Sequence, residues 1–369
     1  MGKVRLKSCL VMKVILVLIS ANWVSTMPIS LWAQQAAPRE GSFILSDFRF
    51  QSGETLPELR VFYRTLGTPA RDAQGRVTNA VLLLHGTSGS GASFLIPAYM
   101  NGMFGPGQLL DAASYYLIIP DNIGTGGSSK PSDGLRMKFP KYDYDDMVAT
   151  QHRLLTEHLK VDHLRLLLGT SQGCMHSYLW SIQHAAFMDA TFAMACQPVE
   201  IAGLNRMRRK MMNDVIMNDP AWMGGNYKDQ PKAGLSSALL MSALVGVSQL
   251  NFQQTYATRT AMDKYVDDYI KSELPKRDAN DVLYQYDSSR NYDPHLQLSK
   301  ITTQFLHVNS ADDIINPPEL GSVEREIKKV AKGRFVLIPI SEKLRGHQSY
   351  NYPELWKQYL DELLKISAK

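Results

Sequence analysis

The chain has 369 residues, with 44% hydrophobic and 20% charged residues and a formal net charge of +5 at pH 7, a composition typical of a soluble globular protein. Four of the positive charges lie in residues 1–33, where there is no Asp or Glu, so the remainder carries a net charge of only +1. Because that remainder has no basic stripe with interleaved aromatic residues, we expect no nucleic-acid partner.

Residues 1–33 have the pattern of a secretory signal peptide. Basic residues come first, an apolar run follows at residues 14–19, and small residues near Ala33 suit cleavage before Gln34, although Leu31 is unfavourable there. An uncleaved N-terminal anchor is the alternative, but the apolar run is short for crossing a bilayer. We therefore expect an exported protein, periplasmic or secreted, with no membrane contact after cleavage.

The chain contains three cysteines, of which Cys9 falls in the expected signal peptide. Cys174 and Cys196 each lie in an apolar setting at or beside a predicted core strand. We interpret them as buried small hydrophobic residues, and a disulfide between them stays open.

The first part of the mature chain predicts strands at residues 43–45 and 59–63, followed by a fully apolar run at residues 80–84. A continuous apolar run is typical of a strand buried on both faces of a mostly parallel sheet. It leads into His85-Gly86-Thr87. Serine hydrolases of α/β architecture place an oxyanion-binding amide after such a pair, so we assign this role to the N–H of Thr87. A phosphate-binding loop is disfavoured because no Lys-Ser/Thr follows the glycines.

The next segments alternate between the two kinds of secondary structure. Apolar runs predict strands at residues 115–120, 166–170 and 190–195, and helical spacing occurs at residues 145–159 and 174–184. This alternation indicates an α/β fold with a mostly parallel central sheet flanked by helices.

The second of these strands, at residues 166–170, runs into Gly169-Thr170-Ser171-Gln172-Gly173, and the second helix follows at once. Gly-x-Ser-x-Gly between a buried strand and a helix is the pattern of a nucleophile elbow, which exposes one serine hydroxyl at a sharp bend. We therefore expect Ser171 to be a nucleophile. The N–H of Gln172, at the start of the helix, is the expected second oxyanion donor.

Strand-like runs disappear between residues 200 and 298, where helical stretches rich in Met and Ala take their place. We interpret residues 200–298 as a helical lid inserted into a core made of residues 41–199 and 299–369. Its methionines are expected to fill gaps in packing. Strands resume at residues 303–308 and 335–339, and an amphipathic helix is predicted at residues 352–366.

A serine nucleophile needs a base, and that base needs a carboxylate that fixes its tautomer. In this fold the partners follow in the order Ser, Asp or Glu, His. His347 comes after the last predicted strand, and Asp312 and Asp313 come after the strand before it. We favour Asp313, four residues before Pro317, as the acid. No group of residues has metal-ligand spacing, and we expect neither a metal nor another cofactor.

The chain resembles the homoserine O-acetyltransferase branch of the α/β-hydrolases from about Phe43 to His347. The matching motifs are Ser52-Gly53-Glu54-Thr55-Leu56-Pro57, Tyr63-Arg64-Thr65-Leu66-Gly67-Thr68, Phe139-Pro140, Asp146-Met147-Val148, Gln151, Gly346-His347 and, most specifically, Asp219-Pro220-Ala221-Trp222-Met223-Gly224-Gly225-Asn226-Tyr227. The resemblance implies a Ser171–His347–Asp313 triad, a helical lid, and often a homodimer formed through that lid. It also places Tyr227 among the candidate substrate-binding residues.

Two departures from the family bear on the substrate. Its transferases carry an Arg six residues before the Asp-Pro pair, where this chain has Asn213, and an Asp after the catalytic His, where this chain has Gln348. The resemblance implies that these residues hold the carboxylate and the amino group of homoserine, and an amide does not replace a guanidinium. Arg206, Arg208 and Arg209 lie nearby as alternative cations.

Three functions follow from these residues. The first is an exported hydrolase of small-molecule esters with a small or moderately apolar acyl group, in which water resolves the acyl-serine. The alternative is O-acyl transfer, as in homoserine O-acetyltransferase, to an alcohol. The third is a non-catalytic binding protein that keeps the fold. Export disfavours the alternative, because acetyl-CoA is a cytoplasmic acyl donor.

Overall fold

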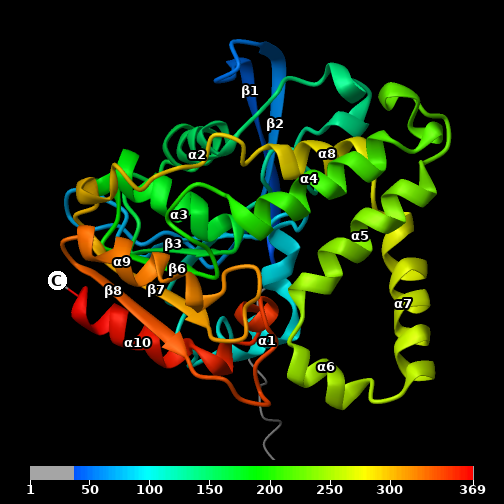
Figure 1. The fold of residues 1–369 in the computed structure, drawn as a ribbon. Coiled ribbons are helices and arrows are strands. Elements are labelled where there is room, and N and C mark those ends of the chain that lie inside the picture. Colours follow the sequence, from blue (N-terminus) through cyan, green and yellow to red (C-terminus); the bar gives the residue numbers. More distant parts are fainter. Residues whose placement is uncertain (1–36, 369) are drawn as a thin grey trace, which may run out of the picture. The chain divides into compact units, whose positions relative to one another are not determined.

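A sheet of eight strands runs through residues 37–368, the part of the chain described by this computed structural model (Figure 1). The expected signal peptide at residues 1–33 and Cys9 lie outside the described residues. The strand order is β1-β2-β4-β3-β5-β6-β7-β8. The strands are β1 Arg39–Arg49, β2 Thr55–Leu66, β3 Ala80–Leu84, β4 Tyr116–Pro120, β5 Leu166–Thr170, β6 Ala190–Met194, β7 Gln304–Ser310 and β8 Gly333–Ile338.

The six strands from β3 to β8 are parallel, and only β1 and β2 run antiparallel to their neighbours. The predicted α/β class with a mostly parallel sheet is therefore confirmed. The first two strands are much longer than predicted, with 11 and 12 residues. They form a hairpin with many exposed side chains, and these positions carry polar residues. Apolar runs therefore predict only the centre of each strand.

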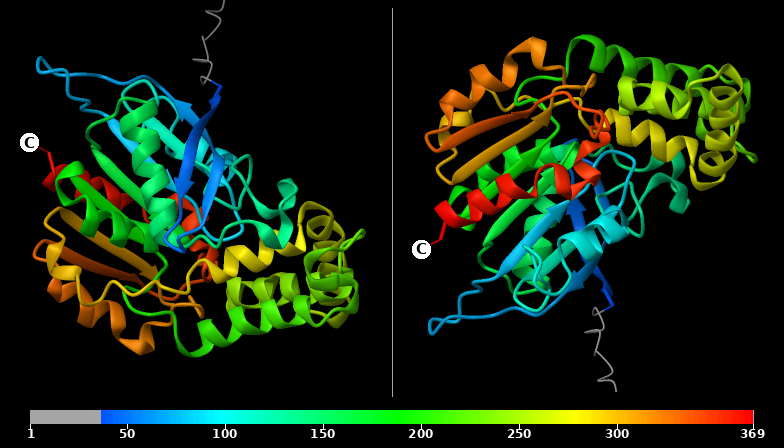
Figure 2. Two further views of the ribbon diagram at one scale, coloured as in Figure 1. Left: turned by 90° about the horizontal axis from the view of Figure 1, so that it is seen from above. Right: turned by 90° about the horizontal axis from the view of Figure 1, so that it is seen from below.

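Helices cover both faces of the sheet (Figure 2). The side chains of Leu82 and Leu84 on β3 belong to the core on the α2 and α3 side, whereas Val81 and Leu83 point into the core on the α1 and α10 side. This burial on both faces explains the unbroken apolar run of β3. The covering helices are α1 Pro97–Gly102, α2 Tyr144–Arg153, α3 Gln172–Gln183, α9 Ser322–Glu326 and α10 Lys357–Ile366.

Five helices lie between β6 and β7 and are here called the lid helices. They surround a small core of their own, to which Met212, Leu235 and Leu283 contribute. The packing expected of the lid methionines holds for Met212, whereas Met207, Met211 and Met217 are exposed. The lid helices are α4 Gly203–Met217, α5 Lys232–Gly246, α6 Gln249–Thr255, α7 Arg259–Glu273 and α8 Ala279–Asp287.

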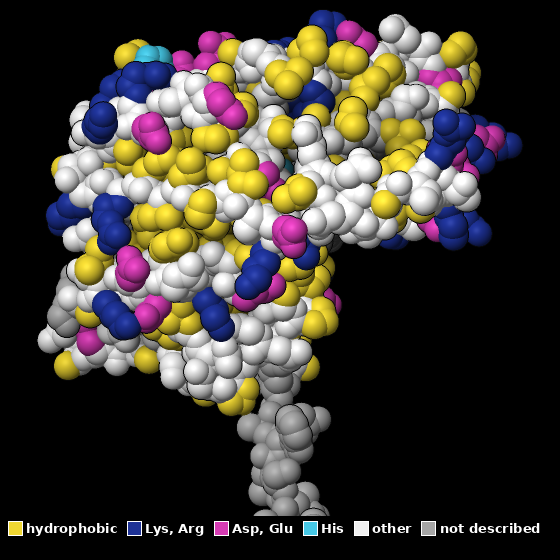
Figure 3. Space-filling view, turned by 60° about the horizontal axis from the view of Figure 1, so that its bottom comes forward, with side chains coloured by type: hydrophobic (Ala, Val, Ile, Leu, Met, Phe, Trp, Pro, Cys, Tyr) yellow, Lys and Arg dark blue, Asp and Glu magenta, His cyan; other side chains and the backbone are white. Residues whose placement is uncertain are grey.

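The surface is mixed in character. On the face shown in Figure 3, Lys and Arg side chains are scattered among acidic and hydrophobic ones rather than gathered in one stripe. Within residues 37–368, no single helix is long and apolar enough to cross a bilayer. Helices α5 and α6 reach that length and composition only when taken together across a bend of 105°.

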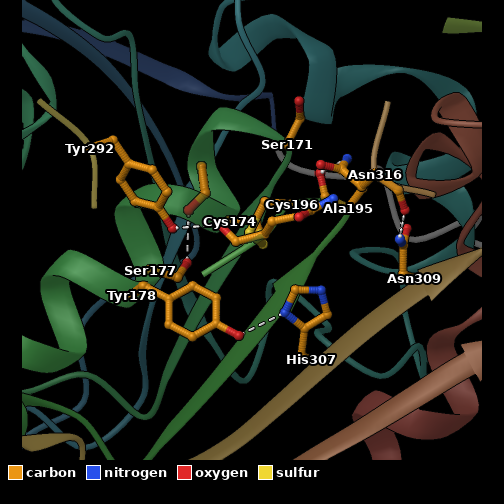
Figure 4. Close-up of a disulfide and its surroundings, with 12 residues drawn as sticks. Ser171, Cys174, Ser177, Tyr178, Ala195, Cys196, Tyr292, His307, Asn309 and Asn316 are labelled. Atoms are coloured by element: carbon orange, nitrogen blue, oxygen red, sulfur yellow. Dashed lines mark hydrogen bonds between the residues drawn. A yellow bond between two sulfur atoms is a disulfide. The ribbon is translucent and has the colours of Figure 1, made fainter. Parts of the chain in front are cut away.

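A disulfide joins Cys174, in the first turn of α3, to Cys196, just after β6 (Figure 4). Both residues are buried, as expected, but their interpretation as simple hydrophobic residues is wrong. The buried strand β6 and the helix that follows Ser171 bring the two side chains together. Together with His307 these sulfurs form a close cluster, but sulfurs bonded to each other are not thiolate ligands for a metal.

We expect this disulfide to stabilise the fold. The two cysteines are separated by 22 residues, and closing a loop of that size contributes roughly 3 kcal/mol to the free energy of unfolding. A reducing agent should therefore lower the urea midpoint of the wild-type protein. The double variant Cys174→Ala/Cys196→Ala should unfold at the same urea concentration with and without the reductant. Equal midpoints for oxidised and reduced wild-type protein would contradict the prediction.

Candidate active site

Ser171 lies at a sharp bend between β5 and α3. Its φ of 54° and ψ of −111° are unusual for a residue other than glycine, and such strain persists only where the surrounding structure enforces it. The N–H of Ser171 donates a hydrogen bond of 2.8 Å to the carbonyl of Met194 at the end of β6. The bend places the partly buried hydroxyl at the edge of the sheet where the parallel strands end, as expected of a nucleophile elbow.

Two glycines make this bend sterically feasible. A Cβ atom on Gly169 would lie 2.0 Å from the carbonyl oxygen of Gly173, and a Cβ on Gly173 would lie 2.0 Å from the carbonyl oxygen of Leu84. Helix α3 therefore packs directly on β5 and on the end of β3, with no room for any side chain. This contact also brings the loop after β3 to the nucleophile, since a Cβ on Gly86 would lie 3.2 Å from that of Ser171.

The structure brings Ser171, His347 and Asp313 into one line of hydrogen bonds. The distance from Ser171 Oγ to His347 Nε2 is 2.8 Å, and that from His347 Nδ1 to Asp313 Oδ2 is 2.9 Å. Asp313 follows β7 and His347 follows β8, so the parallel strands deliver all three side chains to one edge of the sheet. The neighbouring Asp312 accepts the N–H of Gly346 instead, at 2.9 Å.

The Asp313 carboxylate is fully buried and richly hydrogen-bonded. Burial raises its pKa, but the interactions with His347 and Asn316 outweigh burial and hold the pKa below its usual value. The carboxylate therefore stays ionised at neutral pH and can accept the Nδ1–H of His347, which leaves Nε2 free to accept the serine proton. The tautomer is inferred from this network.

Asn316 is a part of this network that sequence reasoning missed. Its Nδ2 atom donates to Asp313 Oδ2 and to the carbonyl oxygen of Ala195, both at 3.0 Å. Its backbone N–H donates to Asp313 Oδ1 at 3.1 Å. An Asn three residues after the chosen Asp is the signal that could have identified it, because the turn folds back onto the carboxylate.

The two expected oxyanion donors lie beside Ser171. Gln172 opens α3, where the helix dipole favours negative charge, and Thr87 lines the same cavity as Ser171. Among the described residues, neither backbone N–H has a hydrogen-bond acceptor. The Gln172 side chain is held in turn, since its Oε1 accepts from Asn122 at 3.1 Å and Asn122 accepts from Gln151 at 2.8 Å.

A cavity of about 70 Å³ opens in front of Ser171 and His347, and its wall is mainly polar. Lid residues form much of this wall, notably Arg208, Arg209 and Tyr286. Arg208 and Arg209 are two of the three alternative cations named from the sequence, whereas Tyr286 is a residue that sequence reasoning missed. A larger cavity of about 330 Å³ adjoins it and shares four wall residues with it. The shared residues are Met175, Asn205, Ile315 and Asn316.

The three residues expected to bind substrate are placed differently. Gln348 lines the cavity, whereas Asn213 and Tyr227 do not. Tyr227 packs in the lid core and donates its hydroxyl to Asp278 at 2.7 Å. Asn213 lies four residues beyond Arg209 on α4, about one turn along the helix, and is not part of the wall that the two arginines help to form. A role of Asn213 and Tyr227 in substrate binding stays a prediction.

Comparison with known proteins agrees with this architecture. Residues 79–339 match the model of the alpha/beta hydrolase fold family. A probable acyltransferase of Methanothermobacter thermautotrophicus is 29% identical, covering 76% of this chain and 85% of that protein. A homoserine O-acetyltransferase of Pelobacter propionicus is 28% identical, covering 88% and 96%. The crystal structure of an acetylester hydrolase from Corynebacterium glutamicum superposes with a TM-score of 0.77 at 19% identity, covering 89% and 96%. These matches confirm the resemblance inferred from the sequence.

The close packing at the elbow leads to a prediction about stability. Gly173→Ala should lower the free energy of unfolding by roughly 2–3 kcal/mol, because its Cβ collides with rigid backbone at Leu84. Gly102→Ala is the matched control, since a Cβ there meets nothing within 4 Å and its φ is not positive. Urea unfolding should show little change for Gly102→Ala. Equal stability of the two variants would contradict this account of the elbow.

Proposed function

The chain belongs to the alpha/beta hydrolase fold family and is an acyl-transfer enzyme similar to homoserine O-acetyltransferases. From this premise we propose that it transfers an acyl group to an alcohol. The acyl group travels through a covalent ester on Ser171. The observation that carries the proposal is the hydrogen-bonded line from Ser171 through His347 to Asp313. Such a line turns a weakly nucleophilic hydroxyl into a nucleophile at neutral pH.

In the first half-reaction, Ser171 Oγ attacks the acyl carbonyl while His347 Nε2 takes the hydroxyl proton. The negative charge that forms on the carbonyl oxygen is met by the N–H groups of Thr87 and Gln172. Collapse of the tetrahedral intermediate breaks the bond to the leaving group, which departs with the proton from His347. The acyl group then remains on Ser171.

In the second half-reaction, the acceptor hydroxyl gives its proton to His347 and its oxygen attacks the acyl-serine. The same two N–H groups stabilise the second oxyanion, and Ser171 leaves with the proton from His347. Asp313 stabilises the imidazolium in both halves without taking a proton itself, which agrees with its lowered pKa. The residues return to their starting state, so the reaction needs no cofactor.

Transfer to an alcohol is supported by the two relatives, which are named as transferases and span most of this chain. They favour the transferase alternative over the hydrolysis that the sequence first suggested. Hydrolysis of an ester remains the second candidate, supported by Asn213 and Gln348, which replace the charged residues of the transferases. The two reactions share the acyl-serine and differ only in the oxygen that attacks it.

We also propose that the protein acts outside the cytoplasm. The Cys174–Cys196 disulfide supports this, since disulfides persist mainly in oxidising compartments. An exported enzyme would meet little acetyl-CoA, so its donor is better sought among esters. A homodimer through the lid helices is a further proposal, which light scattering of the purified protein would test.

The triad assignment leads to a prediction about activity. A fluorophosphonate should label wild-type protein, not Ser171→Ala, and should label His347→Ala only slowly. Asp313→Asn should lower kcat for p-nitrophenyl acetate by roughly 10⁴-fold, because an amide favours the wrong imidazole tautomer. Asp312→Asn is the matched control and should stay within about tenfold of wild type, because Asp312 contacts the backbone of Gly346. The reverse order of the two Asp variants would overturn the assignment.

The choice of acceptor leads to a separate prediction. With p-nitrophenyl acetate as donor, roughly millimolar concentrations of a small primary alcohol should divert most acetyl groups from water to the alcohol. Mass spectrometry would measure the acetylated alcohol and free acetate, with Ser171→Ala as the inactive control. If acetate is the sole product at every alcohol concentration, the protein is an ester hydrolase and the transferase proposal fails.

A further inference from the structure

Two arginines of the lid lie in the wall of the cavity that contains the nucleophile. Arg208 and Arg209, on consecutive positions of α4, line the cavity that also contains Ser171 and His347. Arg209 is 3% exposed and is fixed in place, since its Nη1 atom donates to Ser289 Oγ at 3.1 Å and its Nε to Asn205 Oδ1 at 3.1 Å. Both guanidinium groups lie over the ring of Tyr286, at 5.9 Å and 5.5 Å.

Arg208 has unused hydrogen-bonding capacity. Within residues 37–368, the sole hydrogen bond of its guanidinium group runs from Nη2 to Asn205 Oδ1, at 3.2 Å, and its buried Nε–H has no acceptor. Burial and the neighbouring Arg209 both lower its pKa, although arginine stays charged in proteins. A buried charged donor without an acceptor is costly, so this arrangement favours an anion that supplies the missing acceptors.

The described part of the chain provides no ion-pair partner for these two groups. Neither arginine forms an ion pair with a described Asp or Glu. The described residues that line the cavity include no carboxylate, and Asp313, whose charge acts on Arg208, is engaged by His347 and Asn316. The positive charges in the cavity wall therefore lack a negative partner, which an oxyanion of a bound ligand would supply.

The same wall has no partner for a cation. Gln348 stands where the related transferases carry an Asp, and among the described residues of the wall there is no Asp or Glu to receive an ammonium group. The Tyr286 ring, which could attract a cation, already lies beneath two guanidinium groups. An ammonium group in this cavity would face repulsion without compensation.

We propose that Arg208 and Arg209 form the binding site for the carboxylate of the acyl acceptor, and that this acceptor is a short hydroxy acid without an amino group. The inference rests on the proposed transferase function and adds to it the chemical class of the acceptor. Arg208 supplies the Nε–H and a terminal N–H in a planar fork suited to two carboxylate oxygens, while Arg209 adds charge from behind. The hydroxyl at the other end of a short acid would then face Ser171 and His347.

Four alcohols separate the contributions of the two charges. They are 4-hydroxybutyrate with a carboxylate, 3-aminopropan-1-ol with an ammonium group, homoserine with both, and propan-1-ol with neither. With p-nitrophenyl acetate as donor, kcat/KM for 4-hydroxybutyrate should exceed that for propan-1-ol by roughly 10- to 100-fold, the effect of charged hydrogen bonds. Homoserine should be a poorer acceptor than 4-hydroxybutyrate. A homoserine value equal to or above it would overturn the proposal.

The variants test the assignment to Arg208. In Arg208→Met the preference for 4-hydroxybutyrate over propan-1-ol should fall to within about threefold, and Arg208→Lys should keep part of it. This ratio compares two acceptors on one enzyme, so partial misfolding does not change it. Arg206→Met is the matched control, because Arg206 lies on the same helix but outside the wall of this cavity, and it should keep the wild-type ratio.

A phosphate of the acyl donor is the other source of a suitable anion. With acetyl-CoA as donor, a rise in donor KM in Arg208→Met together with an unchanged acceptor preference would assign the two arginines to the donor and overturn the proposal. An unchanged donor KM together with the lost preference supports it.

A binding measurement keeps this inference separate from the transferase proposal. Butyrate should slow fluorophosphonate labelling of Ser171 at least tenfold more strongly than the neutral isostere butyramide does. That difference should disappear in Arg208→Met and persist in Arg206→Met. If no alcohol accepts the acyl group but butyrate still protects, transfer fails and the carboxylate site stands. If butyrate and butyramide protect equally, the site fails whatever the enzyme transfers.

Discussion

The close contact of α3 with the ends of β3 and β5 is the constraint on which the site depends. Gly169 and Gly173 allow direct contact between backbone segments there, because a Cβ atom at either position would collide with a carbonyl oxygen. This contact sets the strained conformation of Ser171 and brings the loop that carries Thr87 to its hydroxyl. Because the strands are parallel, the loops after β7 and β8 end at the same edge and add the remaining two members of the triad.

Two interactions next to the triad preserve this geometry. Asn316 ties the Asp313 carboxylate to the end of β6 through the carbonyl of Ala195, and the Cys174–Cys196 disulfide ties the same end of β6 to α3. Figure 4 shows both beside Ser171. The turn after β7 and the helix after Ser171 are thus anchored to one strand. A hydrogen-bonded triad needs this rigidity, because small displacements of its members cost rate.

The sequence predicts the sheet and the chemistry better than it predicts the lid. The buried strands appear as apolar runs, and the triad follows from a motif and a chain order that both depend on local structure. The ends of β1 and β2 are not predicted, because exposed strands contain many polar residues and form no apolar run. Arg208 and Arg209 could be named but not placed, because their position in the cavity depends on how α4 packs against the rest of the chain. The disulfide is not predicted for a similar reason, since the two cysteines meet only because α3 packs on β6.

In the proposed function, the division between sheet and lid lets the chain keep one chemistry while the acceptor changes. The sheet supplies the nucleophile, the base, the acid and the oxyanion donors, so changes there would alter the rate for every substrate. In the proposed reaction, the lid residues at the cavity contact the part of the substrate that does not react. A cation at Arg208 rather than at position 213 moves the positive charge by more than one turn of α4. Such a shift, together with Gln348, changes which alcohol fits while leaving the elbow and its glycine contacts untouched.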